Sequence, residues 1–188
     1  MKIILGSASP RRRKLLSDWG YAFDVLNPNV DERAIRTEVS HELPLVLAKA
    51  KNKALMPMAK NAILITSDSV VIHNGQLREK PKDTEELRHF LSTYWEAPAE
   101  VITAVVVSNT MNGKTLEGVE SAKVYFHKFP DKLIEELISH GNLMGVSGGF
   151  IAEMPAMKKY IVYMEGGMDT IMGLPKELTK RLIQEVQQ

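Results

Sequence analysis

The chain has 188 residues, 44% of them hydrophobic and 25% charged, which is typical of a globular protein with one sizeable core or two small ones. Its net charge of +1 disfavours a general RNA- or DNA-binding module, and the absence of cysteine excludes disulfides, zinc–thiolate sites and thiol catalysis. The apolar run after Met1-Lys2 is too short for a signal peptide or a membrane span, so we expect a cytoplasmic protein without nucleic-acid or membrane partners.

Apolar runs alternate with helical patterns along the chain, which predicts a mixed α/β protein with a curved central sheet. Strands are expected over 2–5, 23–26, 62–66, 101–108, 121–129 and 160–164. Helices are expected over 10–19, 42–56, 83–93, 131–140 and 175–186. Asn112-Gly113 is a strong turn signal, so the β-rich segments on either side should form a long hairpin or two adjacent antiparallel strands.

The first predicted helix begins with four cations, Arg11 to Lys14, directly after the helix-start signal Ser9-Pro10. Positive charge is unfavourable at a helix N-terminus unless an anion binds there. A strand, the small-residue turn Gly6-Ser7-Ala8 and a helix N-terminus together form a typical phosphate site.

The helical periodicity divides these cations into two pairs. Arg12 shares the apolar face of the helix with Leu15, Leu16 and Trp19, and Arg11 lies beside that face. A buried guanidinium needs a partner, so we expect Arg11 and Arg12 to bind an anion and Arg13 and Lys14 to face solvent.

Asp68 is the most informative carboxylate. It follows the apolar run Ala62–Ile65 within Thr66-Ser67-Asp68-Ser69, and the chain then returns to the apolar residues Val70–Ile72. A carboxylate at the end of a core strand lies where open α/β sheets place their ligands. An ordinary Asp-Ser turn is the alternative, and the immediate return to the core weakens it.

Lys51 lies at the edge of the apolar face that we assign to the helix over 42–56, a face formed by Leu43, Val46, Leu47, Ala50 and Ala54. Its side chain either extends outward into solvent or reaches into a cleft as a phosphate ligand, and the pattern favours neither. Glu32, Lys80 and Glu153 are weaker candidates, because each lies in a loop where a charged residue is ordinary. The glycines of Gly148-Gly149-Phe150 near Glu153 would allow a ligand to approach closely.

Taken in order, these segments resemble the Maf family of nucleoside triphosphate pyrophosphatases (septum formation protein Maf-like). The matching segments are Leu5-Gly6-Ser7-Ala8-Ser9-Pro10-Arg11-Arg12, Val30-Asp31-Glu32, Lys51-Asn52-Lys53-Ala54, Ser67-Asp68-Ser69-Val70-Val71, Glu79-Lys80-Pro81, Ser147-Gly148-Gly149-Phe150 and Gly173-Leu174-Pro175. The resemblance covers nearly the whole chain and implies one domain over 1–188, with a two-lobed fold related to inosine triphosphatases and a cleft between the lobes.

The resemblance also implies an activity and a set of site residues. Members hydrolyse non-standard or surplus nucleoside triphosphates, such as dTTP, UTP, CTP or 7-methyl-GTP, to the monophosphate and pyrophosphate with a divalent cation, Mg²⁺ or Mn²⁺. Asp68 would be the catalytic base and, with Glu32, a metal ligand. The phosphate-binding residues would be Ser7, Arg11, Arg12, Lys51 and Lys80. A homodimer is expected from the family.

The resemblance also implies three specificity positions, at which this chain combines features of two branches of the family. Arg11 is the residue of the dTTP/UTP branch, Glu153 is that of the 7-methyl-GTP branch, and Ser69 stands where the first branch has threonine and the second glutamine. The base preference is therefore open at this point. The alternative functions are a non-catalytic nucleotide-binding regulator of cell division and an inosine or xanthosine triphosphatase.

Overall fold

A computed structural model describes residues 1–188, the whole chain. The chain forms two compact units, and each unit is assembled from separate segments. Unit 1 comprises Met1–Ser69, Thr103–Glu120 and Met172–Gln188, and unit 2 comprises Val70–Ile102 and Ser121–Ile171. The expectation of a single domain over 1–188 stays a prediction.

Seven strands and seven α-helices make up the regular structure. The strands are β1 (Lys2–Gly6), β2 (Phe23–Val25), β3 (Ala62–His73), β4 (Gln76–Arg78), β5 (Ala99–Asn109), β6 (Thr115–Phe126) and β7 (Ile161–Glu165). The helices are α1 (Pro10–Asp18), α2 (Leu43–Leu55), α3 (Thr84–Thr93), α4 (Asp131–Ser139), α5 (Pro155–Lys158), α6 (Met168–Ile171) and α7 (Lys176–Glu185). Short 3₁₀ helices cover Glu32–Ala34 and Ser147–Gly149.

The strands form one mixed sheet in the order β2-β1-β3-β5-β6-β7, with β4 paired to β3. β1 runs parallel to both β2 and β3, whereas the β3–β4 and β6–β7 pairs are antiparallel. Parallel neighbours need a crossover, and α1 and α2 provide it. The predicted mixed α/β class is confirmed, and β5 and β6 are neighbours joined through the predicted Asn112-Gly113 turn, where Gly113 has a φ of 75°.

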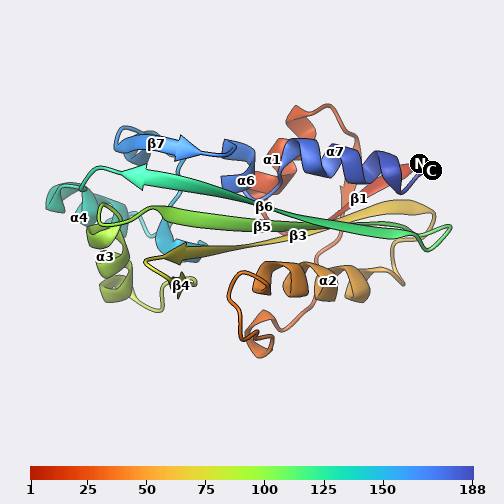
Figure 1. The fold of residues 1–188 in the computed structure, drawn as a ribbon, viewed down its shortest axis with the longest axis horizontal. Helices are drawn as coiled ribbons and strands as arrows, with labels where there is room; N and C mark the ends of the chain where they lie inside the picture. Colours follow the sequence, from red (N-terminus) through yellow and green to blue (C-terminus); the bar gives the residue numbers. More distant parts are fainter. The chain divides into compact units, whose positions relative to one another are not determined.

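Unit 1 buries both faces of its part of the sheet, because alternate residues along each strand point to opposite sides. One face carries Leu5, Ile63 and Ile65, which pack with residues of α1 and α7 such as Leu16 and Leu182. The other face carries Ile4 and Leu64, which pack with Leu55 of α2. Figure 1 shows α1 and α7 on one side of these strands and α2 on the other.

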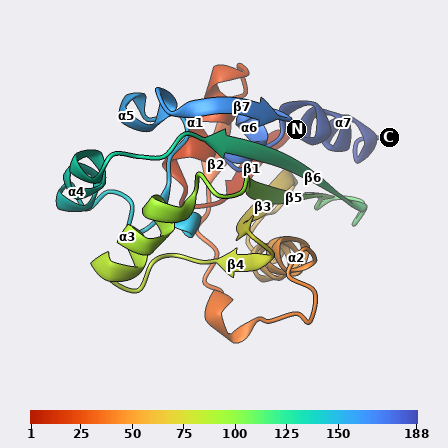
Figure 2. The same ribbon diagram turned by 60° about the vertical axis from the view of Figure 1, so that its left-hand side comes forward.

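Unit 2 has its own core, which is rich in aromatic side chains. Tyr94 is fully buried, and its ring contacts Phe126 and Phe150 with centroid distances of 5.9 and 5.2 Å. Helices α3 and α4 lie side by side in this unit (Figure 2). The guanidinium of Arg78 lies 4.5 Å from the Tyr94 ring centroid, a cation–π contact that lets this buried cation be accommodated.

Two strands are longer than the sequence predicts. β3 does not end at Thr66 but continues to His73, so Asp68 lies within a strand and not in a turn after it. Burial favours this continuation, because every β3 residue except the half-buried Ser69 is buried and an extended backbone keeps both faces in contact with the core. β6 begins at Thr115, six residues before the predicted start, because its first half is a largely exposed strand without a strong apolar signal.

His73 makes the stability of the protein depend on pH. Burial lowers the pKa of its imidazole below the usual 6.5, and the nearby Arg78 lowers the pKa further, against smaller opposing effects from Ala97, Glu96 and Thr93. The unfolded chain takes up a proton at His73 below about pH 6.5, whereas the folded protein resists it. The free energy of unfolding therefore falls as the pH is lowered through this range.

We predict that His73→Phe reduces the loss of stability between pH 7 and pH 5, because it removes the group that the unfolded chain protonates and the folded protein does not. Urea unfolding at a series of pH values measures this loss, and the matched control is His127→Gln, at an exposed histidine of the same unit. Equal pH slopes for the wild type and His73→Phe would contradict the prediction.

Candidate functional site

β3 presents polar side chains to two sides of unit 1 around Asp68. Thr66 donates a hydrogen bond to the carbonyl oxygen of Ala48 in α2 (3.0 Å), and Asp68, two residues on, contacts the same helix. Ser67 and Ser69 alternate with them and contact Arg12 of α1 through a backbone carbonyl and a hydroxyl group. The period of two residues along a strand therefore directs the carboxylate and the serines to opposite sides.

Lys51 of α2 brings two carboxylates together. Its Nζ lies 2.6 Å from Oδ1 of Asp68 and 2.8 Å from Oε1 of Glu32. The side chains of Lys51 and Asp68 are only 7% and 12% exposed, so both charges are largely removed from water and depend on each other. Glu32 is the most accessible of the three, with 44% of its side chain exposed.

The position of Lys51 decides between the two interpretations left open by its helical pattern. The buried face of α2 runs through Leu47, Ala48, Lys51, Asn52 and Leu55, and Lys51 lies at its centre. The face assigned from the sequence was wrong in part, because Val46 and Ala54 are exposed. Lys51 is buried because the carboxylate of Asp68 opposes it, and it does not extend into solvent.

Arg12 is the centre of a second group of contacts. Its Nε donates to the carbonyl oxygen of Gly173 (2.7 Å), and its Nη1 donates to the carbonyl oxygen of Ser67 (2.8 Å). Weaker bonds reach the hydroxyl groups of Ser69 (3.1 Å) and Ser7 (3.5 Å). Burial lowers the pKa of Arg12 from its usual value, and the negative charge of Asp68 opposes this effect.

The loop before α1 follows the sequence prediction closely. Ser9 is the N-cap, and its hydroxyl accepts a hydrogen bond from the backbone nitrogen of Arg12, with Pro10 as the first helical residue. Ser7 is buried and accepts a hydrogen bond from the backbone nitrogen of Ser9 (3.2 Å). Lys14 pairs with Asp18 on the surface, as expected of a solvated residue.

Two other cations of the cluster are partly covered. Arg11 and Arg13 are both half-buried. For Arg13 this differs from the expected solvent-facing position, because the helical pattern places a residue on a face without showing what covers that face.

The structure thus brings the predicted residues of unit 1 into two adjacent groups. Glu32, Lys51 and Asp68 form one, and Ser7, Arg12 and Ser69 form the other. Lys80 and Glu153 belong to unit 2, where Lys80 is exposed and Glu153 is half-buried.

The glycines near Glu153 do not leave room for a ligand, which corrects the sequence interpretation. A Cβ at Gly148 would meet the hydroxyl oxygen of Tyr94 at 2.9 Å, and one at Gly149 would meet Leu87 at 2.6 Å. Core side chains of unit 2 therefore occupy this space. Phe150 is 3% exposed and packs in the same core.

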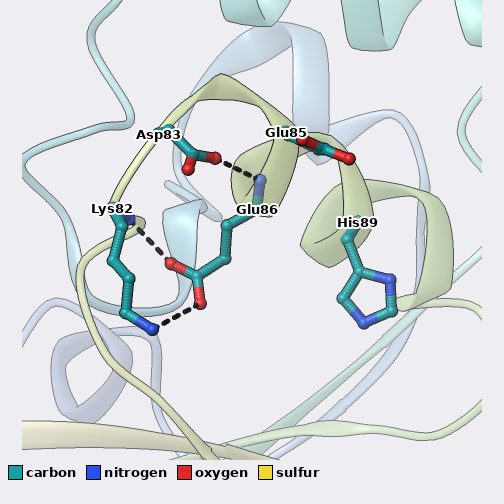
Figure 3. A pocket seen from close by; sticks show the side chains of 5 residues that line it. All are labelled: Lys82, Asp83, Glu85, Glu86 and His89. Carbon is teal, nitrogen blue, oxygen red and sulfur yellow. Dashed lines mark hydrogen bonds and ion pairs between the residues drawn. The ribbon is translucent and has the colours of Figure 1, made fainter.

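Unit 2 also has a surface hollow of about 330 Å³ at the start of α3 (Figure 3). Its lining residues are Lys82, Asp83, Glu85, Glu86 and His89. The carboxylate of Asp83 accepts a hydrogen bond from the backbone nitrogen of Glu86 (2.8 Å), and Glu86 in turn pairs with Lys82. These contacts cap the helix, and none of the residues predicted to bind phosphate or metal lines the hollow.

Sequence reasoning assigned no role to Gly173 and Thr103, which complete the site. Gly173 accepts hydrogen bonds from Arg12 and from the hydroxyl of Ser67 (2.8 Å), and Thr103 shares a hydrogen bond with Ser69 (2.8 Å). Gly173 lies in the Gly173-Leu174-Pro175 segment, so its sequence signal was present, but its contact with Arg12 spans 161 positions.

Nearly the whole chain also matches known proteins. The model of the family described as Maf-like protein matches residues 2–186. The chain belongs to the Maf family.

Among its relatives in that family, the 7-methyl-GTP pyrophosphatase of Dictyostelium discoideum is 40% identical over 99% of this chain and 98% of the relative. The dTTP/UTP pyrophosphatase of Pyrococcus furiosus is 35% identical over 97% and 94%. That of Bdellovibrio bacteriovorus is 32% identical over 96% of both chains. None of the seven α-helices combines the length and the hydrophobicity that a membrane span requires.

We predict that Lys51→Met lowers the free energy of unfolding by about 2–4 kcal/mol, because Asp68 then stays buried without its partner. Lys49→Met is the matched control in the same helix, since Lys49 pairs with Glu117 (2.7 Å) on the surface, with 51% and 40% of the two side chains exposed. The control should lose less than about 1 kcal/mol. Urea denaturation measures both values. Equal losses would show that the buried Lys51–Asp68 pair contributes no more to stability than the exposed Lys49–Glu117 pair.

Proposed function

We propose that this Maf protein hydrolyses a nucleoside triphosphate to the monophosphate and pyrophosphate. The observation that carries the proposal is the convergence of Asp68 and Glu32 on Lys51 next to a phosphate-type loop and helix N-terminus. Family membership supports the reaction, because the relatives are named as nucleotide pyrophosphatases.

In the proposed reaction, a water molecule attacks the α-phosphorus, and Asp68 accepts its proton. The bond from the α-phosphorus to the bridging oxygen breaks, and pyrophosphate leaves with that oxygen. Ser7, Arg11, Lys51 and Lys80 bind the phosphate oxygens and balance the charge that grows on the leaving group. The family resemblance adds Arg12 to this set, although its contacts point to a different role.

The carboxylates fit a divalent cation. Asp68 and Glu32 already share one cation, the ammonium group of Lys51, at 2.6 and 2.8 Å. Magnesium is commonly held by one or two carboxylates together with substrate phosphates. Asp68 and Glu32 are therefore enough as protein ligands. Bound there, Mg²⁺ or Mn²⁺ would neutralise charge on the triphosphate.

Glu153 favours 7-methyl-GTP among the possible substrates. A carboxylate only accepts hydrogen bonds, and the guanine edge offers two neighbouring N–H donors, whereas uracil and thymine offer one between two acceptors. The positive charge of a 7-methylated guanine also suits an anionic partner. The 40% identity to the Dictyostelium 7-methyl-GTP pyrophosphatase supports the same substrate class. A cytoplasmic location and a homodimer stay predictions.

We predict that the protein with Mg²⁺ releases pyrophosphate from at least one member of a panel that contains 7-methyl-GTP, dTTP, UTP, CTP, ITP and XTP. Asp68→Asn should lower kcat by at least about 100-fold, because it removes the proton acceptor. Asp18→Asn, at a surface carboxylate of the same unit, is the control and should keep full activity. EDTA should stop the reaction and added Mg²⁺ restore it.

Two results would reject this mechanism. One is the release of orthophosphate, or of no product, from every triphosphate in the panel. The other is full activity of Asp68→Asn.

A second prediction concerns the base. Glu153→Gln should lower the ratio of kcat/KM for 7-methyl-GTP to that for UTP by at least about tenfold, because the amide presents a donor where the guanine edge needs an acceptor. Glu135→Gln, at a surface glutamate that pairs with Arg88, is the matched control. If the substrate ranking is the same in the wild type and Glu153→Gln, Glu153 does not select the base.

A further inference from the structure

β3 loses β1, the neighbour on one of its edges, just before Asp68. β1 ends at Gly6, which pairs with Thr66, and β3 continues past this point for seven more residues. Ser67 lies one residue beyond the last pair, and its carbonyl oxygen accepts a hydrogen bond from Nη1 of Arg12. The guanidinium thus bonds the strand where β1 no longer can, and a buried carbonyl requires such a partner.

The same guanidinium holds the residue on the other side of Asp68. Nη2 of Arg12 donates to the hydroxyl of Ser69, which in turn pairs with the hydroxyl of Thr103. Nε donates to the carbonyl oxygen of Gly173, and that oxygen also accepts the hydroxyl of Ser67. Both neighbours of Asp68 are therefore tied to Arg12, and Ser67 is also tied to the turn before α7.

These bonds leave Arg12 little capacity for a ligand. A guanidinium has five N–H groups, and Arg12 makes four hydrogen bonds to protein atoms, two of them at 2.8 Å or less. The residue is 9% exposed. We infer that Arg12 is a positioning residue, which holds the Ser67–Ser69 segment so that Asp68 is correctly placed, and that it is not a phosphate ligand.

The inference rests on the proposed function, because it assigns a role in the same reaction. Proton acceptance by Asp68 depends on its distance from the attacking water, and a displacement of about 1 Å can cost about 100-fold in rate. Other groups bind the phosphates. A change at Arg12 should therefore slow the chemical step without weakening phosphate binding.

Gly173 gives a second, independent way to disturb the same contacts. Its φ of 96° favours glycine, and a Cβ there would meet Nε of Arg12 at 2.9 Å and Oγ of Ser69 at 3.1 Å. Gly173→Ala therefore displaces the guanidinium without changing any charge. Arg12→Lys does the opposite, because it keeps the charge and loses the planar set of donors.

The experiment compares Arg12→Lys, Gly173→Ala and Arg11→Met in the full chain, using the best substrate of the panel with Mg²⁺. Both Arg12→Lys and Gly173→Ala should lower kcat by about 10- to 100-fold. In both, the dissociation constant for pyrophosphate, measured by calorimetry, should stay within about twofold of the wild type. Arg11→Met, which removes a proposed phosphate ligand, should weaken pyrophosphate binding by about tenfold or more.

Hydrogen–deuterium exchange of the same variants needs no turnover. The amides of 67–69 should exchange at least about tenfold faster in Arg12→Lys and Gly173→Ala than in the wild type, because their segment has lost its restraint. If the two variants exchange faster but the wild type hydrolyses no triphosphate, the proposed function is rejected. The conclusion that Arg12 restrains the 67–69 segment then still holds. Unchanged exchange or unchanged kcat in Gly173→Ala, or pyrophosphate binding weakened in Arg12→Lys as much as in Arg11→Met, would overturn the inference.

Discussion

The alternation of side chains along β3 is the constraint on which the site depends. Because neighbouring residues of a strand point to opposite faces, Asp68 meets α2 while Ser67 and Ser69 meet α1. A shift of one residue in the register between β1 and β3 would turn the carboxylate toward Arg12 and the serines toward Lys51. The apolar residues Ile63, Leu64 and Ile65, which fill cores on both faces, set this register and so place Asp68.

The features that the sequence predicted best are those with local causes. The start of α1 follows from Ser9 and Pro10, whose capping roles depend only on the next few residues. The buried face of α1, with Arg12 beside Leu15 and Leu16, follows from the 3.6-residue period. Asp68 could be singled out because polar residues interrupt an apolar run, although the inference that the strand ended there was wrong.

The features that the sequence could not predict have partners far along the chain. The segment of Thr66 to Ser69 stays in a strand because Ala48, Lys51 and Gly173 satisfy its polar groups, and no local pattern names these partners. The same reason explains the wrong interpretation of Gly148 and Gly149. A glycine indicates that another group lies close to the backbone. Only the packing shows that here these groups are the side chains of Tyr94 and Leu87.

Lys51 and Arg12, the two buried cations of unit 1, are both held in place by groups of the protein. Removing Lys51, Asp68 and Arg12 from water costs free energy, and their mutual attraction and hydrogen bonds to Gly173 and Ser67 offset that cost during folding. The charges are therefore desolvated and oriented before any substrate binds. Groups held in this way need little reorganisation when charge develops in a transition state, which is the condition for strong electrostatic stabilisation. The burial that makes Lys51 and Asp68 costly to fold would thus suit them to the proposed phosphoanhydride chemistry, while Arg12 holds the segment around Asp68 in place.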